Sequence, residues 1–241
     1  MLKVHIKNSL PLVLLLLMFL PASAQWTGIK GNGKVVRESR DLRNFDAISV
    51  GGSFDVFLRQ GRSQSLVVEA DENLLDIIST EVNNGTLKIK TEKNIQQAEK
   101  LNIFITVEDL RSLEVSGAAD LIAEGSIYAD DLKIKCSGSA DVKLLDLRAE
   151  NLACSASGSA DIRLAGRAQS LTASMSGSSD LQARDFKTES CTLQLSGSSD
   201  AFVYASQSLT ASASGSSDVH CYGSPEHRQV SSSGAADVNF P

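Results

Sequence analysis

The sequence has few aromatic residues and few histidines. Phe, Trp and Tyr make up 5% of the 241 residues, and Trp26 is the only tryptophan, so few rings are available for stacking on sugars or bases. Beyond residue 24 the only histidines are His220 and His227. No Gly-rich phosphate loop, metal-ligand cluster or lone activated serine accompanies them. The sequence therefore favours a binding or structural protein over an enzyme and predicts no cofactor.

Long apolar runs are also lacking, apart from one at the N-terminus. Lys3 and Lys7 precede an apolar stretch at residues 10–20, which ends at the small residues Ala22-Ser23-Ala24. That stretch is shorter than the roughly 20 residues needed to cross a bilayer, and its layout is that of a secretory leader. We expect residues 1–24 to be a signal peptide, and the mature chain to lack a membrane span. The protein is then exported to the periplasm, the cell surface or the extracellular space.

Positive charge is in deficit. The chain has 23 Lys and Arg against 29 Asp and Glu. Removal of the leader takes away Lys3 and Lys7, so the mature balance is 21 − 29 = −8. A net negative charge argues against nucleic acid and anionic membrane surfaces as partners. It is compatible with divalent cations or neutral glycans.

The four cysteines show no CxxC or other metal-binding spacing. Most of them occupy positions that other repeats fill with Leu, Ile, Ala or Met, which predicts small buried hydrophobic residues. Since an exported chain permits disulfides, one bridge, for example between neighbouring coils, is the alternative. The residues concerned are Cys136, Cys154, Cys191 and Cys221, with Cys136–Cys154 as the example of a bridge.

A repeat dominates the second half of the chain. The motif Ser-Gly-[Ala/Ser]-[Ala/Ser]-Asp occurs seven times, and successive aspartates are 21, 20, 19, 20, 18 and 19 residues apart. Such a regular period indicates a repeat architecture. The motif glycines are Gly117, Gly138, Gly158, Gly177, Gly197, Gly215 and Gly234, and the motif aspartates are Asp120, Asp141, Asp161, Asp180, Asp200, Asp218 and Asp237.

Apolar and polar residues alternate on both sides of each motif, as in Leu132-Lys133-Ile134-Lys135-Cys136. This period of two indicates half-buried strands. Two short strands and two turns account for about 20 residues, one coil of a solenoid. A β-propeller would need roughly 40 residues per blade. We therefore predict an all-β fold: a single-stranded parallel β-helix, or two-sheet β-solenoid, with right-handed coils, the usual hand for parallel strands.

The organisation before the repeats is less regular. We expect residues 25–110 to form irregular N-terminal coils and a cap, continuous with a regular solenoid at 111–241. Gly52-Ser53-Phe54-Asp55 is a degenerate copy of the motif, which extends the same architecture back towards residue 45. One short helix is expected after Asp71, with this residue as its N-cap.

The motif residues have separate expected roles. Each glycine is expected at a sharp turn with positive φ, as a structural residue. Each aspartate can accept hydrogen bonds from N–H groups of its own turn. Carboxylates stacked every 4.8 Å or so repel one another by roughly 1 kcal/mol per pair, so a line of Ca²⁺ ions along the seven aspartates is the alternative.

Several segments resemble the GIN-domain family, named for the head domain of autotransporter adhesins and found in secreted proteins of Bacteroidetes-type bacteria. The resemblance covers nearly the whole mature chain and implies a β-helical fold, no catalytic residues and a role in adhesion. The repeated Ser-Gly-Ser-x-Asp turns are similar to the family's second half. Its first half is matched by Gly31-Asn32-Gly33-Lys34-Val35-Val36, Val50-Gly51-Gly52-Ser53-Phe54-Asp55-Val56 and Gly85-Thr86-Leu87-Lys88-Ile89.

Together these observations predict an adhesion or ligand-binding module outside the cytoplasm. Its solenoid surface would contact a glycan or a protein, and the chain could form a homo-oligomer. A carbohydrate-active β-helix enzyme, such as a polysaccharide lyase or hydrolase, and a purely structural periplasmic protein are the alternatives.

Overall fold

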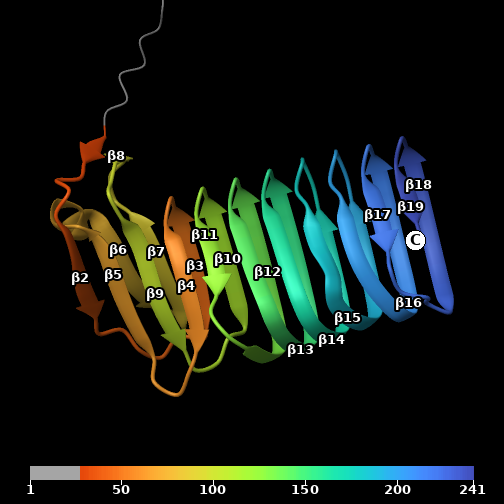
Figure 1. Ribbon diagram of the computed structural model, residues 1–241, viewed down its shortest axis with the longest axis horizontal. Helices are drawn as coiled ribbons and strands as arrows, with labels where there is room; N and C mark the ends of the chain where they lie inside the picture. Colours follow the sequence, from red (N-terminus) through yellow and green to blue (C-terminus); the bar gives the residue numbers. More distant parts are fainter. Residues whose placement is uncertain (1–27) are drawn as a thin grey trace, which may run out of the picture.

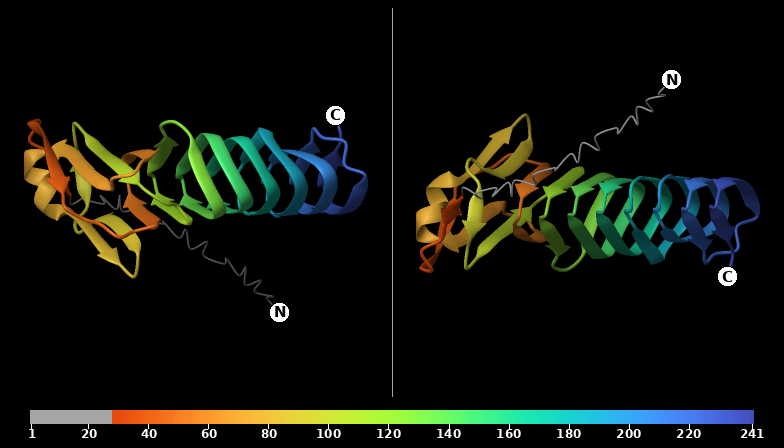
Figure 2. Two further views of the ribbon diagram at one scale, coloured as in Figure 1. Left: turned by 90° about the horizontal axis from the view of Figure 1, so that it is seen from below. Right: turned by 90° about the horizontal axis from the view of Figure 1, so that it is seen from above.

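The computed structural model describes residues 28–241, so the predicted signal peptide lies outside the described residues. Parallel strands stack in register along one axis and form an elongated solenoid (Figure 1). Views from above and below show the coils following one another as a regular spiral (Figure 2). The predicted all-β solenoid is confirmed.

The regular coils begin after residue 111. Each of their strands pairs in parallel with the equivalent strand of the next coil. The strands are β10 (Ser112–Gly117), β11 (Asp120–Ala123), β12 (Ile127–Gly138), β13 (Asp141–Gly158), β14 (Asp161–Met175), β15 (Leu181–Leu195), β16 (Ala201–Gly215), β17 (Asp218–Cys221), β18 (His227–Gly234) and β19 (Asp237–Asn239).

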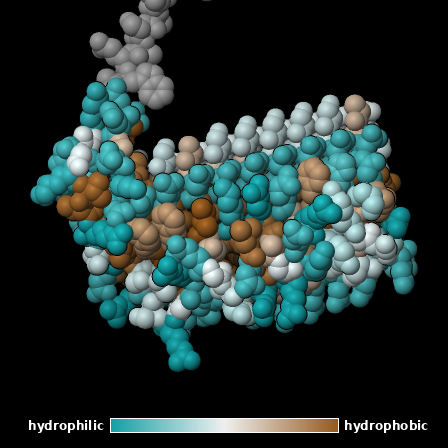
Figure 3. Space-filling model, in the orientation of Figure 1, coloured by the Kyte–Doolittle hydropathy of each residue, from teal (hydrophilic) through white to brown (hydrophobic). Residues whose placement is uncertain are grey.

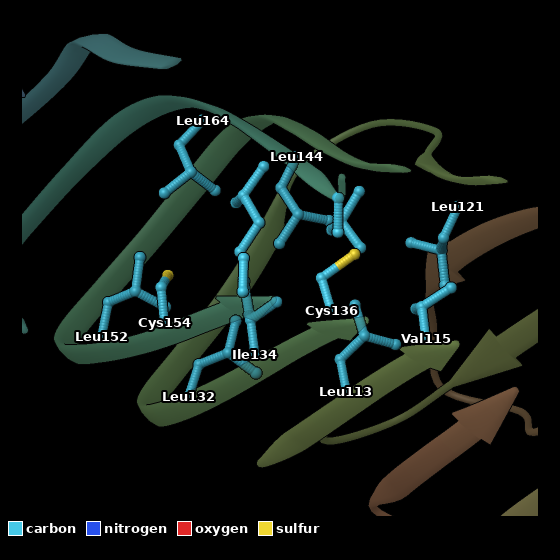
Figure 4. Close-up of a cluster of buried hydrophobic side chains, with 14 of the residues drawn as sticks. Leu113, Val115, Leu121, Leu132, Ile134, Cys136, Leu144, Leu152, Cys154 and Leu164 are labelled. Atoms are coloured by element: carbon cyan, nitrogen blue, oxygen red, sulfur yellow. The ribbon is translucent and has the colours of Figure 1, made fainter. Parts of the chain in front are cut away.

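Alternation along each strand sends one set of side chains inward and the other outward. In β13, Leu152 and Cys154 are buried, whereas Ala153 between them is exposed. The pairing Leu132↔Leu152↔Leu171 stacks like on like, because the coils are in register. Inward side chains from the strands before and after each Ser-Gly turn meet in the interior (Figure 4). Burial of each large aliphatic side chain contributes about 1.5–3 kcal/mol.

The turn between these strands depends on its glycine. Gly177 has φ of +85°, a conformation that side chains disfavour. Its position is also too close to the preceding coil for a side chain, because a Cβ there would lie 2.5 Å from the carbonyl oxygen of Gly158. That carbonyl accepts a hydrogen bond of 2.7 Å from the N–H of Ser178. All seven motif glycines share this conformation, with φ between 77° and 85°, at Gly117, Gly138, Gly158, Gly177, Gly197, Gly215 and Gly234.

The N-terminal segment continues the stack and then departs from it. β3 (Ala47–Gly52) and β4 (Asp55–Gln60) form the coil next to β10 and β11, with Gly52 paired to Gly117 and Asp55 to Asp120. On the other side of this coil, β7 (Thr86–Thr91) pairs with β3 and β9 (Leu101–Val107) pairs with β4. The elements of this segment are β1 (Ile29–Lys30), β2 (Val35–Arg40), β3 (Ala47–Gly52), β4 (Asp55–Gln60), β5 (Ser65–Asp71), η1 (Glu72–Ile77), β6 (Ile78–Asn83), β7 (Thr86–Thr91), β8 (Ile95–Gln97) and β9 (Leu101–Val107).

Antiparallel pairing covers this end of the solenoid. β5 pairs antiparallel with both β2 and β9, and β6 pairs antiparallel with β7. β1 and β8 form a separate two-stranded sheet. Because β2 and β6 each run antiparallel to their one strand partner, the parallel ladder ends here.

The expected role of Asp71 is wrong in one respect. The residue precedes η1, a 3₁₀ helix, but its side chain makes no capping hydrogen bond. Its buried carboxylate instead accepts bonds from the N–H groups of Gly33, Glu99 and Lys100, which join three separate segments. Burial raises the pKa of Asp71, but these N–H bonds outweigh burial and the pKa is lowered. Asp71 therefore connects the segments of the cap.

All four cysteines are free and buried in the interior. Cys136 and Cys154 occupy neighbouring coils but different inward positions, because Cys136 pairs with Ala156 and Cys154 with Ile134 (Figure 4). The alternative of a bridge between them is therefore wrong, and the cysteines act as small hydrophobic residues. Burial raises the pKa of both thiols to about 12.

Substitution of a motif glycine should therefore destabilise the solenoid strongly. Gly177→Ala should lower the free energy of unfolding by more than the ~1 kcal/mol of an average point mutation, measured by urea denaturation. Gly125→Ala is the matched control: Gly125 also has positive φ (+96°), but a Cβ there meets nothing within 4 Å. Equal losses in the two variants would show that backbone strain alone, and not contact between coils, accounts for the effect.

The thiols should resist modification while the protein is folded. Because reactivity belongs to the thiolate, a thiol-specific disulfide reagent at pH 8 should label none of the four cysteines in the native state. All four should react after unfolding in guanidinium. Rapid native labelling, or fewer than four reactive thiols in the unfolded non-reduced protein, would contradict the buried, reduced arrangement.

Candidate functional site

The aspartates of the repeat form a column beside the Ser-Gly turns. Their hydrogen bonds differ from the expected local turn bonds. Asp180 Oδ1 accepts a bond of 3.3 Å from the N–H of Asp200, and Asp200 Oδ1 accepts one of 3.0 Å from the N–H of Asp218. The same arrangement links Asp161 to Asp180 and Asp218 to Asp237. Each carboxylate thus connects two coils rather than closing its own turn, because the N–H at this position points along the axis.

A buried serine makes the bond within the turn instead. Ser179 Oγ donates to the carbonyl of Ser176 at 3.0 Å, and Ser199 and Ser217 donate in the same way within their own turns at 3.1 and 3.0 Å. These three side chains belong to fully buried residues. The sequence signal for this role is the fourth motif position, which is Ser in these coils and Ala in the others.

In the first regular coils the connection runs through the backbone. The N–H of Asp141 donates to the carbonyl of Ala119, and that of Asp161 to the carbonyl of Ala140, both at 3.2 Å. The N–H of Asp120 donates to the carbonyl of Phe54 in the degenerate copy of the motif. The column therefore changes its bonding along the axis while keeping its register.

Stacking of like charges alters the acidity of this column. Burial, followed by the charge of Asp141, raises the pKa of Asp120. Burial likewise raises the pKa of Asp180; the N–H of Asp200 offsets part of this effect, and the charges of Asp161 and Asp200 add to it. No group of three or more His, Cys, Asp or Glu side chains in residues 28–241 is arranged to hold a metal ion. The calcium alternative stays a prediction.

A groove of about 580 Å³ runs along the strands that precede the turns. Serines of successive coils line it, and Ser155, Ser174 and Ser212 share one outward column with Gln194. The turns themselves form the pale ridge along the upper edge of the molecule (Figure 3). Since hydroxyl groups both donate and accept hydrogen bonds, this groove suits a neutral polar ligand.

A second outward column lies just beyond the looser bend of each coil. In it, Tyr128 pairs with Arg148, Arg148 with Arg167, Arg167 with Lys187, and Lys187 with Tyr204. We call these five residues the tyrosine–basic column. This column was not predicted from the sequence, because its residues belong to no motif. Their spacings of 20, 19, 20 and 17 residues match the repeat period, and alignment of the coils would have revealed them.

Gln60 holds the first tyrosine of the column in place. Its side-chain amide donates to the carbonyls of Glu108 and Tyr128, and its oxygen accepts a bond of 2.7 Å from the N–H of Tyr128. Tyr128 is 52% exposed, and the Arg148 guanidinium lies 5.4 Å from the centre of its ring. An exposed ring on a backbone that two hydrogen bonds fix to Gln60 is arranged for contact with a ligand.

The start of the column opens into a groove of about 740 Å³. Tyr128, Arg148 and Arg167 line it, together with Arg111, whose Nε lies 2.7 Å from Asp46 Oδ1. This groove lies on the outer surface, as the serine-lined groove does. Both candidate sites are therefore external and extend over several coils.

Comparison with known proteins gives this architecture a family. Residues 44–225 match the model of the family described as "Putative auto-transporter adhesin, head GIN domain". The chain belongs to the GIN-domain family. The resemblance expected from the sequence is thus confirmed, and this GIN-domain protein has no match among curated proteins.

Solved structures share the solenoid of this GIN-domain chain. A "putative adhesin" from Bacteroides fragilis superimposes with a TM-score of 0.86 at 22% identity, covering 89% of this chain and 100% of the other. A "putative adhesin" from Parabacteroides merdae gives 0.70 at 23% identity, with 88% and 98% covered. A "putative lipid binding protein" from Parabacteroides distasonis gives 0.71 at 25% identity, with 88% and 99% covered.

The GIN-domain family suggests an exported adhesion-like module with a binding partner. Within residues 28–241 the structure contains no helix that is long and apolar enough to span a bilayer.

Charge repulsion in the aspartate column of this GIN-domain protein should be measurable. Asp180→Asn keeps an oxygen acceptor for the N–H of Asp200 but removes one charge, so it should raise the free energy of unfolding at pH 7 by about 1 kcal/mol. The pKa of Asp180 is raised in the folded state. The contribution of its carboxyl group to the free energy of unfolding is therefore fully present below the unfolded pKa and is lost as the pH rises through the folded pKa. The advantage of the variant should therefore vanish near pH 3, as followed by urea denaturation.

Divalent cations provide the control for this interpretation. EDTA should leave the melting temperature of the wild type unchanged, because one aspartate per coil supplies few of the six to eight oxygens that Ca²⁺ prefers. A melting temperature that rises with calcium concentration would show that the column holds cations. Asp180→Asn would then destabilise the protein at pH 7.

Proposed function

We propose that this protein is an exported adhesion module that binds a glycan or protein partner through the outer surface of its solenoid. The observation that carries this proposal is the pair of grooves along the axis, each lined by equivalent residues of successive coils. A surface of this kind contacts an extended partner at many equivalent points, and such contacts add up along the ligand.

The filled interior supports an external mode of binding. Side chains such as Leu132, Ile134 and Leu144 occupy the space between the strands (Figure 4). The neighbour from P. distasonis is described as a lipid binding protein, and this description applies to that protein. In this chain, an acyl chain would have to lie against the outer surface.

The carbohydrate-active enzyme receives less support from the same geometry. Glycoside hydrolysis uses two carboxyl groups in different environments, one acting as acid and the other as base or nucleophile. Four successive motif aspartates instead share one arrangement, because each accepts the N–H of the aspartate in the next coil: Asp161, Asp180, Asp200 and Asp218. Repetition of this kind is expected of a scaffold.

Binding and location can be tested together. The purified protein should bind at least one member of a panel of immobilised neutral and acidic polysaccharides and extracellular-matrix proteins, saturably and without releasing reducing ends. On intact cells it should be accessible to added protease. Release of reducing ends would favour the enzyme. Protection from protease, with release only on opening the periplasm, and no binding to the panel would favour a structural periplasmic protein.

A further inference from the structure

The tyrosine–basic column concentrates an unusual set of residues for this chain. The protein has only three tyrosines. Tyr128 and Tyr204 stand at the two ends of the column, with three basic residues between them. The third, Tyr222, directly follows β17 in the next coil, where its N–H bonds to the carbonyl of Val203 beside Tyr204. In a chain with an excess of acidic residues, the column is a narrow line of positive charge, and Asp130, Asp131 and Glu150 lie beside it in the groove at its first end.

Among the described residues, two of the three basic residues of the column have no ion-pair partner, and the third has only a distant one. Arg148 has one distant ionic contact, 3.8 Å from its Nε to Asp146 Oδ1. Among the residues that the structure describes, the ion pairs include neither Arg167 nor Lys187, and both residues are exposed. Like charges directly opposite one another in a sheet are destabilising. The arrangement is therefore unfavourable for the isolated protein and becomes favourable when an anionic ligand binds.

Acidic residues flank the column and restrict the shape of that ligand. Glu150 and Glu189 lie two positions further along their strands than Arg148 and Lys187, and both are exposed. Outward positions two residues apart lie side by side on one face of a strand. A broad anionic surface, such as a membrane or duplex DNA, would cover both columns and meet repulsion at the second. A single linear polyanion can follow the basic column alone.

The tyrosines add affinity for sugar rings to this positive line. Tyr128 is 52% exposed and lines the 740 Å³ groove, and the Tyr204 ring has the Lys187 ammonium 3.9 Å from its centre. Phenol rings present an apolar face and a hydroxyl group, which suits the apolar face and the hydroxyl groups of a pyranose. Basic residues between such rings match a polymer that alternates rings with anionic groups.

We propose that the tyrosine–basic column binds one chain of an acidic linear polysaccharide. Carboxylate or sulfate groups of the polymer pair with Arg148, Arg167 and Lys187, and a sugar ring lies against Tyr128. This inference rests on the proposed binding function and specifies the ligand class for one of its two surfaces.

The test compares charge-matched variants against defined polymers. The ladder variant Arg148→Gln, Arg167→Gln, Lys187→Gln removes the charges but keeps long polar side chains. The control variant Lys133→Gln, Lys143→Gln, Arg163→Gln removes the same net charge from other outward positions. Polygalacturonate and dextran sulfate are the anionic probes, and unmodified dextran is the neutral one. Biolayer interferometry at 50 and 300 mM NaCl measures binding.

Wild type should bind an anionic probe, and higher salt should weaken the binding. The ladder variant should bind at least tenfold more weakly, whereas the control should stay within about threefold of wild type. Tyr128→Ala should weaken binding without changing its dependence on salt. The ladder variant should melt no lower than wild type, because it removes repulsion, so its loss of binding cannot be attributed to unfolding.

Four results would overturn the inference. Equal weakening in the ladder and control variants would indicate diffuse electrostatic attraction. Binding to dextran, or to a protein of the wider panel, without binding to either anionic probe would refute the acidic ligand while leaving the adhesion function intact. Absence of binding to every polymer and protein would overturn the inference and the proposed function together. Preferential binding of single-stranded DNA over both anionic polysaccharides would also refute it.

Discussion

Close approach of successive coils at the Ser-Gly turns controls the geometry of the whole molecule. The N–H that follows each turn glycine donates to the glycine carbonyl of the preceding coil, as Ser178 does to Gly158. A side chain at Gly177 would occupy the space of that carbonyl. Because this contact recurs at every turn, the strands next to the turns keep one register. Farther from the turns, the register shifts at irregularities such as those at Leu144/Leu147 and Arg163/Ala165.

Because the register is fixed, equivalent outward residues of successive coils lie in a column. The charges within one column therefore add up along the axis. In the aspartate column, N–H donors from the next coil reach Asp180 and Asp200 and partly offset the repulsion between carboxylates. In the tyrosine–basic column, Arg167 has no ion-pair partner within the described residues, and Arg148 has only the distant carboxylate of Asp146. The repulsion between like charges is thus partly offset within the fold at the aspartate column. At the tyrosine–basic column, the basic side chains remain available to an external partner.

Much of this fold follows from the sequence because the repeat determines it. Alternation around Leu132-Lys133-Ile134 gives the strands, the motif spacing gives the coil length, and Gly177 gives the turn with positive φ. The antiparallel cap was not predictable in detail, because Asp71 acts through contacts with Gly33 and Glu99, which are distant in sequence. The aspartate bonds were misassigned for a related reason. A single turn considered alone offers local donors, whereas the actual donor belongs to the next coil.

The tyrosine–basic column could not be recognised as a motif because its members differ from coil to coil. Tyr128, Arg148 and Tyr204 share only their phase within the repeat. Variation is tolerated at that phase because the side chains point outward, away from the packed interior. The repeated motif therefore specifies the scaffold. The outward positions, whose residues vary from coil to coil, determine the chemistry of each surface.

Register stacking also makes the length of a binding surface a countable property of the chain. Insertion of one whole coil lengthens every outward column by one strand spacing, about 4.8 Å, and leaves the turns and interior positions matched. A gene that duplicates or loses units of 18 to 21 residues can thus change how many repeats of a linear polymer its product spans. Each added coil needs only a new outward side chain, so the reach of the surface and its chemical preference can evolve separately.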